Sequence, residues 1–369
     1  MRFIISGGGT AGHINPAIAI ADKLKELDGN SEMVFVGRES GMEGKLVSNA
    51  GYPIWNLNVR GLKRSLSPDN LKTAVSTVKA VKEAKKMIES FSPDAVIGTG
   101  GYVCFPVLYA ASKKGIYTAL HESNAVPGLA VRLLKNKVDR VFTGFEGCAK
   151  KLGKKALYTG NPLRCGFALH TRESAREMLG MKGKYRYLVL SFGGSLGAKT
   201  VNNVALDIMA ELTSERSDIL HLHSCGKNYG KSFCGELEKR GLDKCKNIRV
   251  SEYIYDMPTC ICAADAVICR SGAMTLTELS AAGAPAVLIP SPNVTGDHQF
   301  KNATEYADTG AAYVVSEREL SDLANAVGYV RQIITDKYKR EEMSKAALAF
   351  AKTDAADKIA REILQLKKR

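Results

Sequence analysis

The chain has 369 residues, enough for two ordinary domains, and its 24 % charged and 45 % hydrophobic residues are typical of a globular protein. No apolar run approaches the roughly 20 residues of a spanning helix, the first residues read as a strand and not as a signal peptide, and the nine cysteines lack zinc-ribbon spacing, so a cytoplasmic protein with reduced thiols is expected. The formal net charge of +14 is consistent with binding to a polyanionic partner, with binding to an anionic surface, or with a charge that only keeps the protein soluble. Charge alone does not distinguish these three explanations.

Strand-like apolar runs alternate with helical patterns along the whole chain. In the first half the expected strands are 2–6, 33–36, 54–57, 95–98, 117–120 and 140–143. In the second half they are 187–192, 219–223, 248–250, 266–269, 286–289 and 312–315. This alternation predicts the α/β class, with two Rossmann-like parallel-sheet domains facing a cleft, and ligands at the carboxyl ends of the strands.

A domain boundary is expected near residues 160–164, where Gly-Asn-Pro interrupts regular structure. The first domain is then 1–163 and the second 164–349. The tail, about 350–369, reads as an amphipathic helix with Ile359, Ile363 and Leu366 on one face.

The first strand runs into a glycine-rich turn, 7–13, that formally satisfies G-x-G-x-x-G. A dinucleotide site would also want an acidic residue at the end of the second strand, and Glu39 is poorly placed for that role. Pro16 is expected in the first turn of the following helix, where proline is tolerated, so that His13 lies just before the helix. His13 is then either an ordinary loop residue or a catalytic group beside a phosphate-binding turn.

Four further segments are rich in glycine or polar residues directly after a strand. They are Gly98–Tyr102, His121–Asn124, Gly193–Ala198 and Cys269–Glu278. The third repeats the glycine turn and helix start of the first half, which suits an anion. In the fourth, Ser271 is expected to cap a helix. Glu278 then lies in the first turns of that helix, where its carboxylate either is stabilised by the helix dipole or accepts hydrogen bonds from sugar hydroxyls.

Taken together, these segments closely resemble the MurG family, the UDP-N-acetylglucosamine:N-acetylmuramyl-(pentapeptide) pyrophosphoryl-undecaprenol N-acetylglucosamine transferases. Seven motifs appear in order between residues 7 and 303: 8–13, 100–102, 121–124, 160–164, 193–198, 270–278, and 297–303. One departure is Ala11, where many members have glycine, and alanine still permits close approach.

The resemblance implies the two-domain GT-B architecture, with the C-terminal helix packing back on the N-terminal domain. It implies inverting transfer of GlcNAc from UDP-GlcNAc to the 4-hydroxyl of the muramyl sugar of lipid I, forming lipid II at the cytoplasmic face of the cell membrane. It also implies no cofactor, and cell-wall synthesis proteins as partners. Carried over by position, the UDP-GlcNAc contacts are Thr10, Ala11, Gly12, Asn124, Arg164, Ser195, Ile254, Ala273, Met274, Thr275, Leu276, Thr277, Glu278 and Gln299.

Roles for these residues follow from their chemistry. Ser195 and Arg164 suit the diphosphate, the backbone at Ile254 suits uracil, and Glu278 and Gln299 suit the ribose and GlcNAc hydroxyls. No D-x-D occurs, so metal-independent transfer is expected. His13 is predicted to be the general base or to orient it, with His121 and Glu122 as competitors and Glu122 retained as a second catalytic candidate.

Residues 60–90 contain a group of basic residues that we call the basic stripe: Arg60, Lys63, Arg64, Lys72, Lys79, Lys82, Lys85 and Lys86. Apolar residues are interleaved with them: Leu62, Leu66, Leu71, Val75, Val78 and Val81. The segment is either a solvated amphipathic helix packed on the sheet or a peripheral contact with anionic lipid headgroups.

Three rival functions leave residues unexplained. A nicotinamide enzyme would use only the first glycine loop, and a nucleic-acid binder would show aromatic or arginine clusters on a recognised module, so no nucleic acid is expected. Other GT-B enzymes acting on lipids, such as diacylglycerol glycosyltransferase or lipid A disaccharide synthase, do not match segments 8–13 and 121–124.

Overall fold

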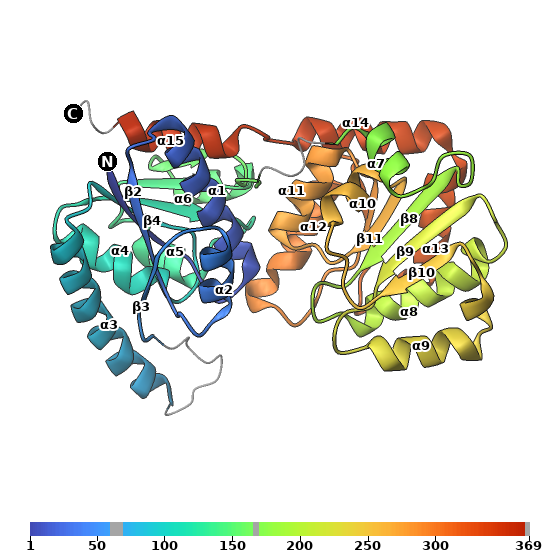
Figure 1. Ribbon diagram of the computed structural model, residues 1–369, viewed down its shortest axis with the longest axis horizontal. Coiled ribbons are helices and arrows are strands. Elements are labelled where there is room, and N and C mark those ends of the chain that lie inside the picture. Colours follow the sequence, from blue (N-terminus) through green and yellow to red (C-terminus); the bar gives the residue numbers. More distant parts are fainter. Residues whose placement is uncertain (60–68, 165–169, 366–369) are drawn as a thin grey trace. The chain divides into compact units, whose positions relative to one another are not determined.

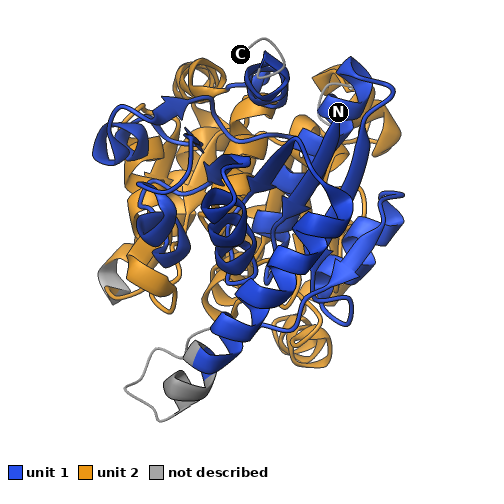
Figure 2. Ribbon diagram, turned by 90° about the vertical axis from the view of Figure 1, so that its left-hand side faces the viewer, with its two compact units in different colours: residues 1–164, 352–369 blue, residues 165–351 orange. Residues whose placement is uncertain are grey.

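The computed structural model describes residues 1–59, 69–164 and 170–365, which form two compact units (Figure 1). Unit 1 comprises residues 1–164 and 352–369, and unit 2 comprises residues 165–351 (Figure 2). The chain thus leaves unit 1 after Arg164, builds unit 2, and returns to unit 1 for its last helix.

Unit 1 is built on a seven-stranded parallel sheet in the order β3-β2-β1-β4-β5-β6-β7. Its strands are β1 (Arg2–Ser6), β2 (Glu32–Gly37), β3 (Ile54–Asn56), β4 (Ala95–Gly98), β5 (Tyr117–Glu122), β6 (Arg140–Thr143) and β7 (Ala156–Tyr158). Strand β1 is apolar on both faces because helices cover both faces of the sheet. Accordingly Ile4 belongs to the core on one side, and Phe3 and Ile5 to the core on the other.

The helices of unit 1 are α1 (Ala11–Leu27), α2 (Met42–Asn49), α3 (Asp69–Phe91), α4 (Cys104–Lys113), α5 (Leu129–Leu134), α6 (Glu146–Leu152) and α15 (Ala355–Leu364). Helix α15 packs on α1, where Ile359 and Ile363 are fully buried in the same core as Ile14 and Ile18 (Figure 1). These two isoleucines were predicted to share one face; Leu366 lies outside the described residues.

Unit 2 is built on a six-stranded parallel sheet in the order β10-β9-β8-β11-β12-β13. Its strands are β8 (Tyr187–Phe192), β9 (Ile219–Ser224), β10 (Ile248–Ser251), β11 (Ala266–Cys269), β12 (Ala286–Leu288) and β13 (Ala312–Val314). Its helices are α7 (Arg172–Met178), α8 (Lys199–Ile208) with the π-helical turn η2 (Met209–Thr213), α9 (Gly230–Lys239), η3 (Leu242–Lys244), α10 (Met257–Ala263), α11 (Ala273–Ala282), η4 (Thr295–Asp297), α12 (His298–Ala307), α13 (Leu320–Thr335) and α14 (Lys337–Phe350).

Every predicted strand is present, and its ends differ from the prediction by at most two residues. Strand β7 was missed. It has three residues at the edge of its sheet, and its central Leu157 is 43 % exposed. A strand this short and this exposed has no apolar pattern by which it could be recognised.

Each sheet reverses its strand order once, between β1 and β4 in unit 1 and between β8 and β11 in unit 2. At such a point the loops after the two strands diverge, which leaves room for a ligand at the carboxyl ends. The segments 7–13, 98–102, 193–198 and 269–278 follow these four strands. The topology therefore brings the glycine-rich segments together in pairs, one pair in each unit.

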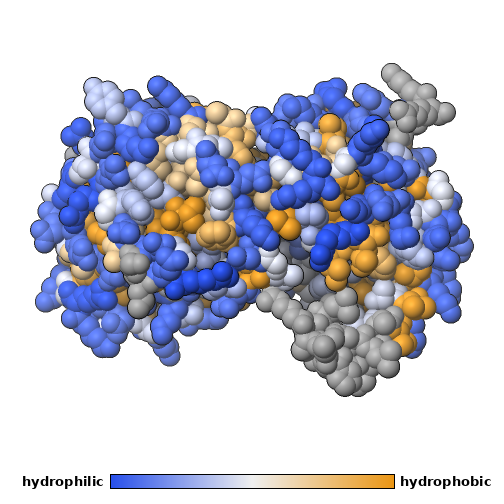
Figure 3. Space-filling model, turned by 180° about the vertical axis from the view of Figure 1, so that it is seen from behind, coloured by the Kyte–Doolittle hydropathy of each residue, from blue (hydrophilic) through white to orange (hydrophobic). Residues whose placement is uncertain are grey.

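Helix α3 is an amphipathic helix packed on unit 1, as one interpretation of the basic stripe predicts. Its Ala80, Ala84 and Ile88 are buried against the core of unit 1, while Val75 and Val78 are more than half exposed. Lys79, Lys82, Lys85 and Lys86 are all exposed on the same helix. Arg60, Lys63, Arg64, Leu62 and Leu66 lie outside the described residues, as do the side chains of Leu71 and Lys72. Hydrophilic residues cover much of the face drawn in Figure 3, interrupted by hydrophobic patches.

Candidate active site

In unit 1 the glycine loops after β1 and β4 touch each other. Gly9 (φ 86°) and Gly101 (φ 82°) adopt the left-handed backbone conformation that glycine takes without strain. A Cβ atom on Gly101 would lie 2.2 Å from the carbonyl oxygen of Gly8, so only glycine allows this approach. The Thr99 hydroxyl donates to the His13 carbonyl at 2.7 Å and joins the second loop to the start of α1.

Helix α1 begins at Ala11 with Thr10 as its N-cap, so the predicted contacts Thr10, Ala11 and Gly12 lie together at the helix N-terminus. The amides of His13 and Ile14 donate to the Thr10 carbonyl. The amides of Ala11 and Gly12 precede them and have no acceptor within the helix. The first turn contains no acidic residue. This positive end of the helix is therefore suited to an anion.

The helix starts earlier than predicted, which corrects two expectations. His13 is the third helical residue and does not precede the helix, and Pro16 is the sixth and lies beyond the first turn. Because proline has no N–H, the Gly12 carbonyl receives no hydrogen bond from residue 16. The carbonyl of the next residue, His13, accepts a tertiary hydrogen bond from the Thr99 hydroxyl.

The hydrogen bonds of His13 define its neutral tautomer. Its Nδ1 lies 3.1 Å from the Gly8 carbonyl oxygen and 3.2 Å from the Thr10 hydroxyl. Since a carbonyl can only accept, Nδ1 carries the proton, and the lone pair of the neutral ring is on Nε2. A Cβ on Gly100 would lie 3.1 Å from Nε2, so this nitrogen faces the second glycine loop.

His121 and Glu122, at the end of β5, both have partners within the protein. His121 is fully buried, its Nε2 lies 3.4 Å from the Gly160 carbonyl oxygen, and burial lowers its pKa to about 4. The Glu122 carboxylate accepts from the backbone and side-chain nitrogens of Asn124, at 2.9 and 3.0 Å, and from the Gly128 amide at 2.7 Å. Glu122 therefore fixes the loop that carries Asn124 and orients its amide.

Arg164 is the exposed last residue of the first stretch of unit 1. Burial and a hydrogen bond to Asp22 raise the pKa of the Tyr52 phenol. The positive charge of Arg164 is close enough to Tyr52 to oppose this increase. The described residues offer Arg164 no carboxylate partner. Within the described ranges it is therefore a cation without a counter-ion, near the end of β7.

In unit 2 the loop after β8 has the same glycine chemistry. Gly194 (φ 91°) and Gly197 (φ 85°) are both left-handed, and a Cβ on Gly197 would lie 2.1 Å from the Cys225 carbonyl oxygen. Ser195 is exposed at the tip, and its carbonyl accepts from the Lys227 amide at 3.2 Å. Helix α8 begins only at Lys199, so the hydroxyl of Ser195 precedes the helix N-terminus by four residues.

Ser271 does not cap α11, contrary to expectation. Gly272 is the N-cap, and the Ser271 hydroxyl donates instead to the Gln299 carbonyl at 2.8 Å. The side-chain oxygen of Gln299 in turn accepts from the Ser291 amide at 2.8 Å. Because the side-chain oxygen of Gln299 already accepts this hydrogen bond, the NH₂ group is the part of its amide that can donate to a ligand.

The side chains of the predicted segment 273–278 divide into two groups. Leu276 is fully buried and its amide donates to the Gly272 carbonyl at 3.0 Å, while the Thr277 hydroxyl donates to the Ala273 carbonyl at 2.9 Å. These two side chains therefore face the protein. Met274 and Thr275 are partly exposed.

Glu278 lies in the second turn of α11, on the partly exposed side. Within the described ranges no group hydrogen-bonds to its carboxylate, and burial raises its pKa to about 7. A carboxylate that has lost water without gaining a protein partner is destabilised in its charged form. Hydroxyl donors from a ligand would supply what the protein does not.

The predicted contacts within each unit thus collect at one edge of its sheet. In unit 1 residues 10–13 follow β1, and Glu122 and Asn124 lie at the end of β5. In unit 2 the contacts follow four strands: Ser195 after β8, Ile254 after β10, residues 273–278 after β11 and Gln299 after β12.

Two acidic residues at these edges were not anticipated. Glu43 on α2 is 2 % exposed beneath the first glycine loop, where its carboxylate accepts from the Arg38 amide at 3.3 Å and lies 3.5 Å from the Gly9 amide. Glu317 pairs with Arg270, and the Thr200 hydroxyl donates to it. Gly9 lies 34 residues from Glu43, and Arg270 lies 47 residues from Glu317, so no local motif could have revealed these contacts.

Glu317 lines a pocket at the carboxyl edge of unit 2, together with Pro290, Phe300 and Asp297. Across residues 1–59, 69–164 and 170–365, no group of three or more His, Cys, Asp or Glu side chains is arranged to hold a metal ion. No helix in the same ranges is long and apolar enough to cross a membrane.

Both units match one class of enzyme. The model of the glycosyltransferase family 28 N-terminal domain matches residues 3–143, and that of the family 28 C-terminal domain matches residues 188–359. The fold and the site therefore define a two-domain glycosyltransferase.

Relatives and solved structures narrow this class. The chain is 40 % identical to the UDP-N-acetylglucosamine--N-acetylmuramyl-(pentapeptide) pyrophosphoryl-undecaprenol N-acetylglucosamine transferase of Acetivibrio thermocellus, over 97 % of this chain and 96 % of the relative. It is 37 % identical to the Bacillus cytotoxicus protein of the same name over all of both chains. The crystal structure of Acinetobacter baumannii MurG is similar, with a TM-score of 0.77 and 26 % identity over 99 % of both chains. The chain belongs to this family of N-acetylglucosamine transferases.

The same fold occurs in proteins of other kinds. The UDP-GlcNAc 2-epimerase from Neisseria meningitidis, solved with UDP-GlcNAc bound, has a TM-score of 0.72 at 14 % identity and covers 99 % of this chain and all of its own. At that identity the likeness shows the fold alone.

Proposed function

We propose that the protein transfers GlcNAc from UDP-GlcNAc to the 4-hydroxyl of the muramyl sugar of lipid I, with inversion at the anomeric carbon, to form lipid II. The observation that carries this proposal is the 40 % identity, over 97 % of the chain, to a transferase whose name states this donor and acceptor. The predicted contacts at the carboxyl edges of both sheets support it.

His13 is the proposed base. As the acceptor oxygen bonds to the anomeric carbon, the bond from that carbon to the diphosphate breaks, and UDP leaves with the electron pair. The proton of the acceptor hydroxyl passes to Nε2 of His13, which carries the lone pair because Nδ1 donates to the Gly8 carbonyl. His121 is a poor base because it is buried and its pKa lies at about 4. Glu122 acts by holding Asn124.

Unit 2 supplies the proposed donor contacts. Glu278 accepts from the ribose hydroxyls, which replaces the hydrogen bonds that its half-buried carboxylate lacks. Gln299 donates to the hydroxyls of GlcNAc, and the backbone at Ile254 contacts uracil. Ser195 binds the diphosphate, and Arg164 of unit 1 neutralises the charge that develops on the leaving UDP. No metal ion or other cofactor takes part.

The enzyme acts in this proposal as a peripheral protein on the anionic cytoplasmic face of the cell membrane, where lipid I is held. Support comes from α3, whose exposed lysines and exposed Val75 and Val78 lie on a helix anchored by its other face. Such a helix combines electrostatic attraction with an apolar surface. Cell-wall synthesis proteins are the proposed partners at this membrane.

The test is transfer of radiolabelled GlcNAc from UDP-GlcNAc to a lipid I analogue by the purified protein. Absence of product overturns the function. General-base catalysis typically contributes about 10²–10⁴-fold, so His13→Ala should lower kcat by that factor while UDP-GlcNAc affinity changes little. A loss smaller than about tenfold, with His121→Ala or Glu122→Ala folded yet inactive, would move the base to residue 121 or 122.

A further inference from the structure

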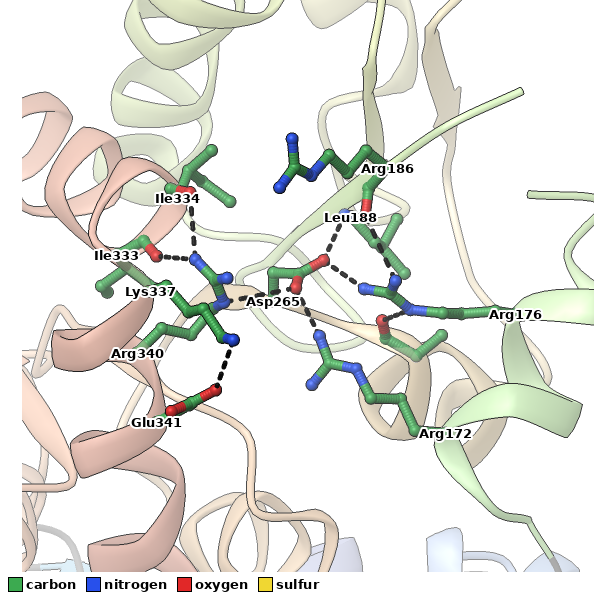
Figure 4. A network of polar contacts seen from close by, with 11 residues as sticks. Arg172, Arg176, Arg186, Leu188, Asp265, Ile333, Ile334, Lys337, Arg340 and Glu341 are labelled. Atoms are coloured by element: carbon green, nitrogen blue, oxygen red, sulfur yellow. Dashed lines mark hydrogen bonds and ion pairs between the residues drawn. The ribbon is translucent and has the colours of Figure 1, made fainter. Parts of the chain in front are cut away.

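A second polar pocket in unit 2 lies at the opposite edge of its sheet from the candidate donor site. It is formed by Tyr187 at the start of β8, by Asp265 just before β11, and by helices α7 and α14 (Figure 4). The glycine loop 193–198 and the segment 270–278 begin at the other ends of these same two strands. The pocket is therefore separate from the proposed UDP-GlcNAc contacts.

Positive charge exceeds negative charge in this pocket. Four arginine side chains line it: Arg172, Arg176, Arg186 and Arg340. The carboxylates are those of Asp265 and Glu341. Asp265 is buried, pairs with Arg172 and Arg176, and accepts from the Leu188 amide at 2.8 Å, while Glu341 lies 3.7 Å from Lys337 (Figure 4).

Two of the four arginines hold the unit together. Arg176 donates to the carbonyls of Ala263 and Arg186, both at 3.2 Å. Arg340 donates to two carbonyls near the end of α13, at 2.8 and 3.0 Å, and its Nε lies 3.7 Å from Asp265. These guanidiniums join α7 and α14 to the sheet through hydrogen bonds to backbone carbonyls and through ion pairs with Asp265.

Arg172 and Arg186 have donors that the described part of the chain does not engage. A guanidinium has five N–H donors, yet Arg172 has Asp265 as its one partner and is 37 % exposed. Arg186 is exposed, and its guanidinium lies over the Tyr187 ring, 5.2 Å from its centroid. Arg340 lies 5.3 Å from the same ring. Arg186 and Arg340 therefore lie near one aromatic ring, as does Arg216, at 5.3 Å.

The pKa of Arg172 reflects this crowding. Burial lowers it, the attraction of Asp265 opposes the decrease, and repulsion from Arg176 and Arg340 adds to it. An anion seated between the guanidiniums would relieve the repulsion.

We propose that this pocket binds the phosphoryl or pyrophosphoryl group of a ligand through Arg172 and Arg186. Planar guanidiniums match phosphate oxygens two at a time, and Arg176 and Arg340 add positive potential from fixed positions. A free phosphorylated molecule and a phospholipid headgroup share this chemistry. The proposal concerns binding only and does not depend on the transferase activity.

The test compares two variants with the wild-type protein. Arg172→Gln/Arg186→Gln removes the proposed ligands and leaves Arg176 and Arg340 on Asp265. Arg249→Gln is the matched control, since this exposed arginine of the same unit also lies over a tyrosine, 5.9 Å from the ring centroid of Tyr185. Inorganic pyrophosphate is titrated by calorimetry in saturating UDP, which occupies the proposed donor site, and vesicles of phosphatidylcholine with phosphatidylglycerol are tested by co-sedimentation.

The expected result is a pyrophosphate Kd that rises about tenfold or more in the double variant and stays unchanged in Arg249→Gln, since charge-assisted hydrogen bonds are lost. If only vesicle binding falls selectively in the double variant, the phosphate comes from a lipid headgroup and the assignment of the pocket stands. If neither probe distinguishes the double variant from the control, the pocket is purely structural and the proposal is wrong. Arg186→Gln alone keeps the test decisive should the double variant fail to fold, because the described residues offer the Arg186 guanidinium no ion pair, and Asp218, whose pKa it helps to lower, is held by Arg216.

Discussion

Replacing Glu278 by glutamine should stabilise the protein and weaken donor binding at the same time. In the folded state burial raises the pKa of Glu278 from 4.5 to about 7. A tenfold change in proton affinity is worth about 1.4 kcal/mol, so the ionised carboxylate costs the folded state about 3 kcal/mol at most. Because the folded pKa lies above the unfolded one, this cost is absent below about pH 4.5, grows as the pH rises, and is complete above about pH 7.

The assay is thermal unfolding of the wild-type protein and Glu278→Gln between pH 5 and 8, with calorimetric titration of UDP-GlcNAc. The variant should gain stability progressively toward pH 8, by up to about 3 kcal/mol, yet lose donor affinity by about 1.5–3 kcal/mol because hydrogen bonds to a charged group are lost. Glu238→Gln, at an exposed site on α9, is the control and should change neither quantity. A Glu278→Gln variant with unchanged donor affinity would remove the ribose assignment, and one without the pH-dependent gain in stability would refute the argument from burial.

Three further predictions address the metal, the membrane and the glycine loops. Transfer should survive excess EDTA, because helix N-termini and Arg164 are proposed to hold the diphosphate; turnover abolished by chelation and restored by magnesium would contradict this. Changing Lys79, Lys82, Lys85 and Lys86 together to Glu should release the protein from anionic vesicles, since each lysine contributes about 1 kcal/mol near such a surface, and high salt should do the same to the wild-type protein. Co-sedimentation that resists both treatments would exclude an electrostatic contact through α3. Gly101→Ala should destabilise unit 1 by about 1–3 kcal/mol or more, because it needs a left-handed alanine and a Cβ 2.2 Å from a carbonyl oxygen. An unchanged melting temperature would show that the two loops separate easily.

The sequence was sufficient for the features that depend on local periodicity. Strands β1 and β8 and the glycine turns after them were predicted at the positions where the structure has them. The reason is that a buried parallel strand and a tight turn each need particular residues at adjacent positions. The order of the strands in each sheet was not predicted and comes from the tertiary structure. Strand β7 was missed because three exposed edge residues need no such pattern.

Boundaries at the helix starts were less predictable. Pro16 indicated a helix start near itself, but α1 begins at Ala11, five residues earlier. Ser271 was expected to cap α11, but its hydroxyl donates instead to the carbonyl of Gln299, which follows another strand. In the second case a partner distant in sequence overrides a local preference.

The sequence by itself determined the fold class, the two glycine-loop units and the family. Only the tertiary structure decided what each polar group does: that His13 is protonated on Nδ1, that Glu122 holds a loop, and that Glu278 is half-buried with no hydrogen-bond partner among the described residues. It alone brought Arg172 and Arg340 to Asp265. The physical reason is that hydrogen bonding and desolvation depend on which atoms are neighbours in space, and parallel sheets make neighbours of residues that lie far apart along the chain.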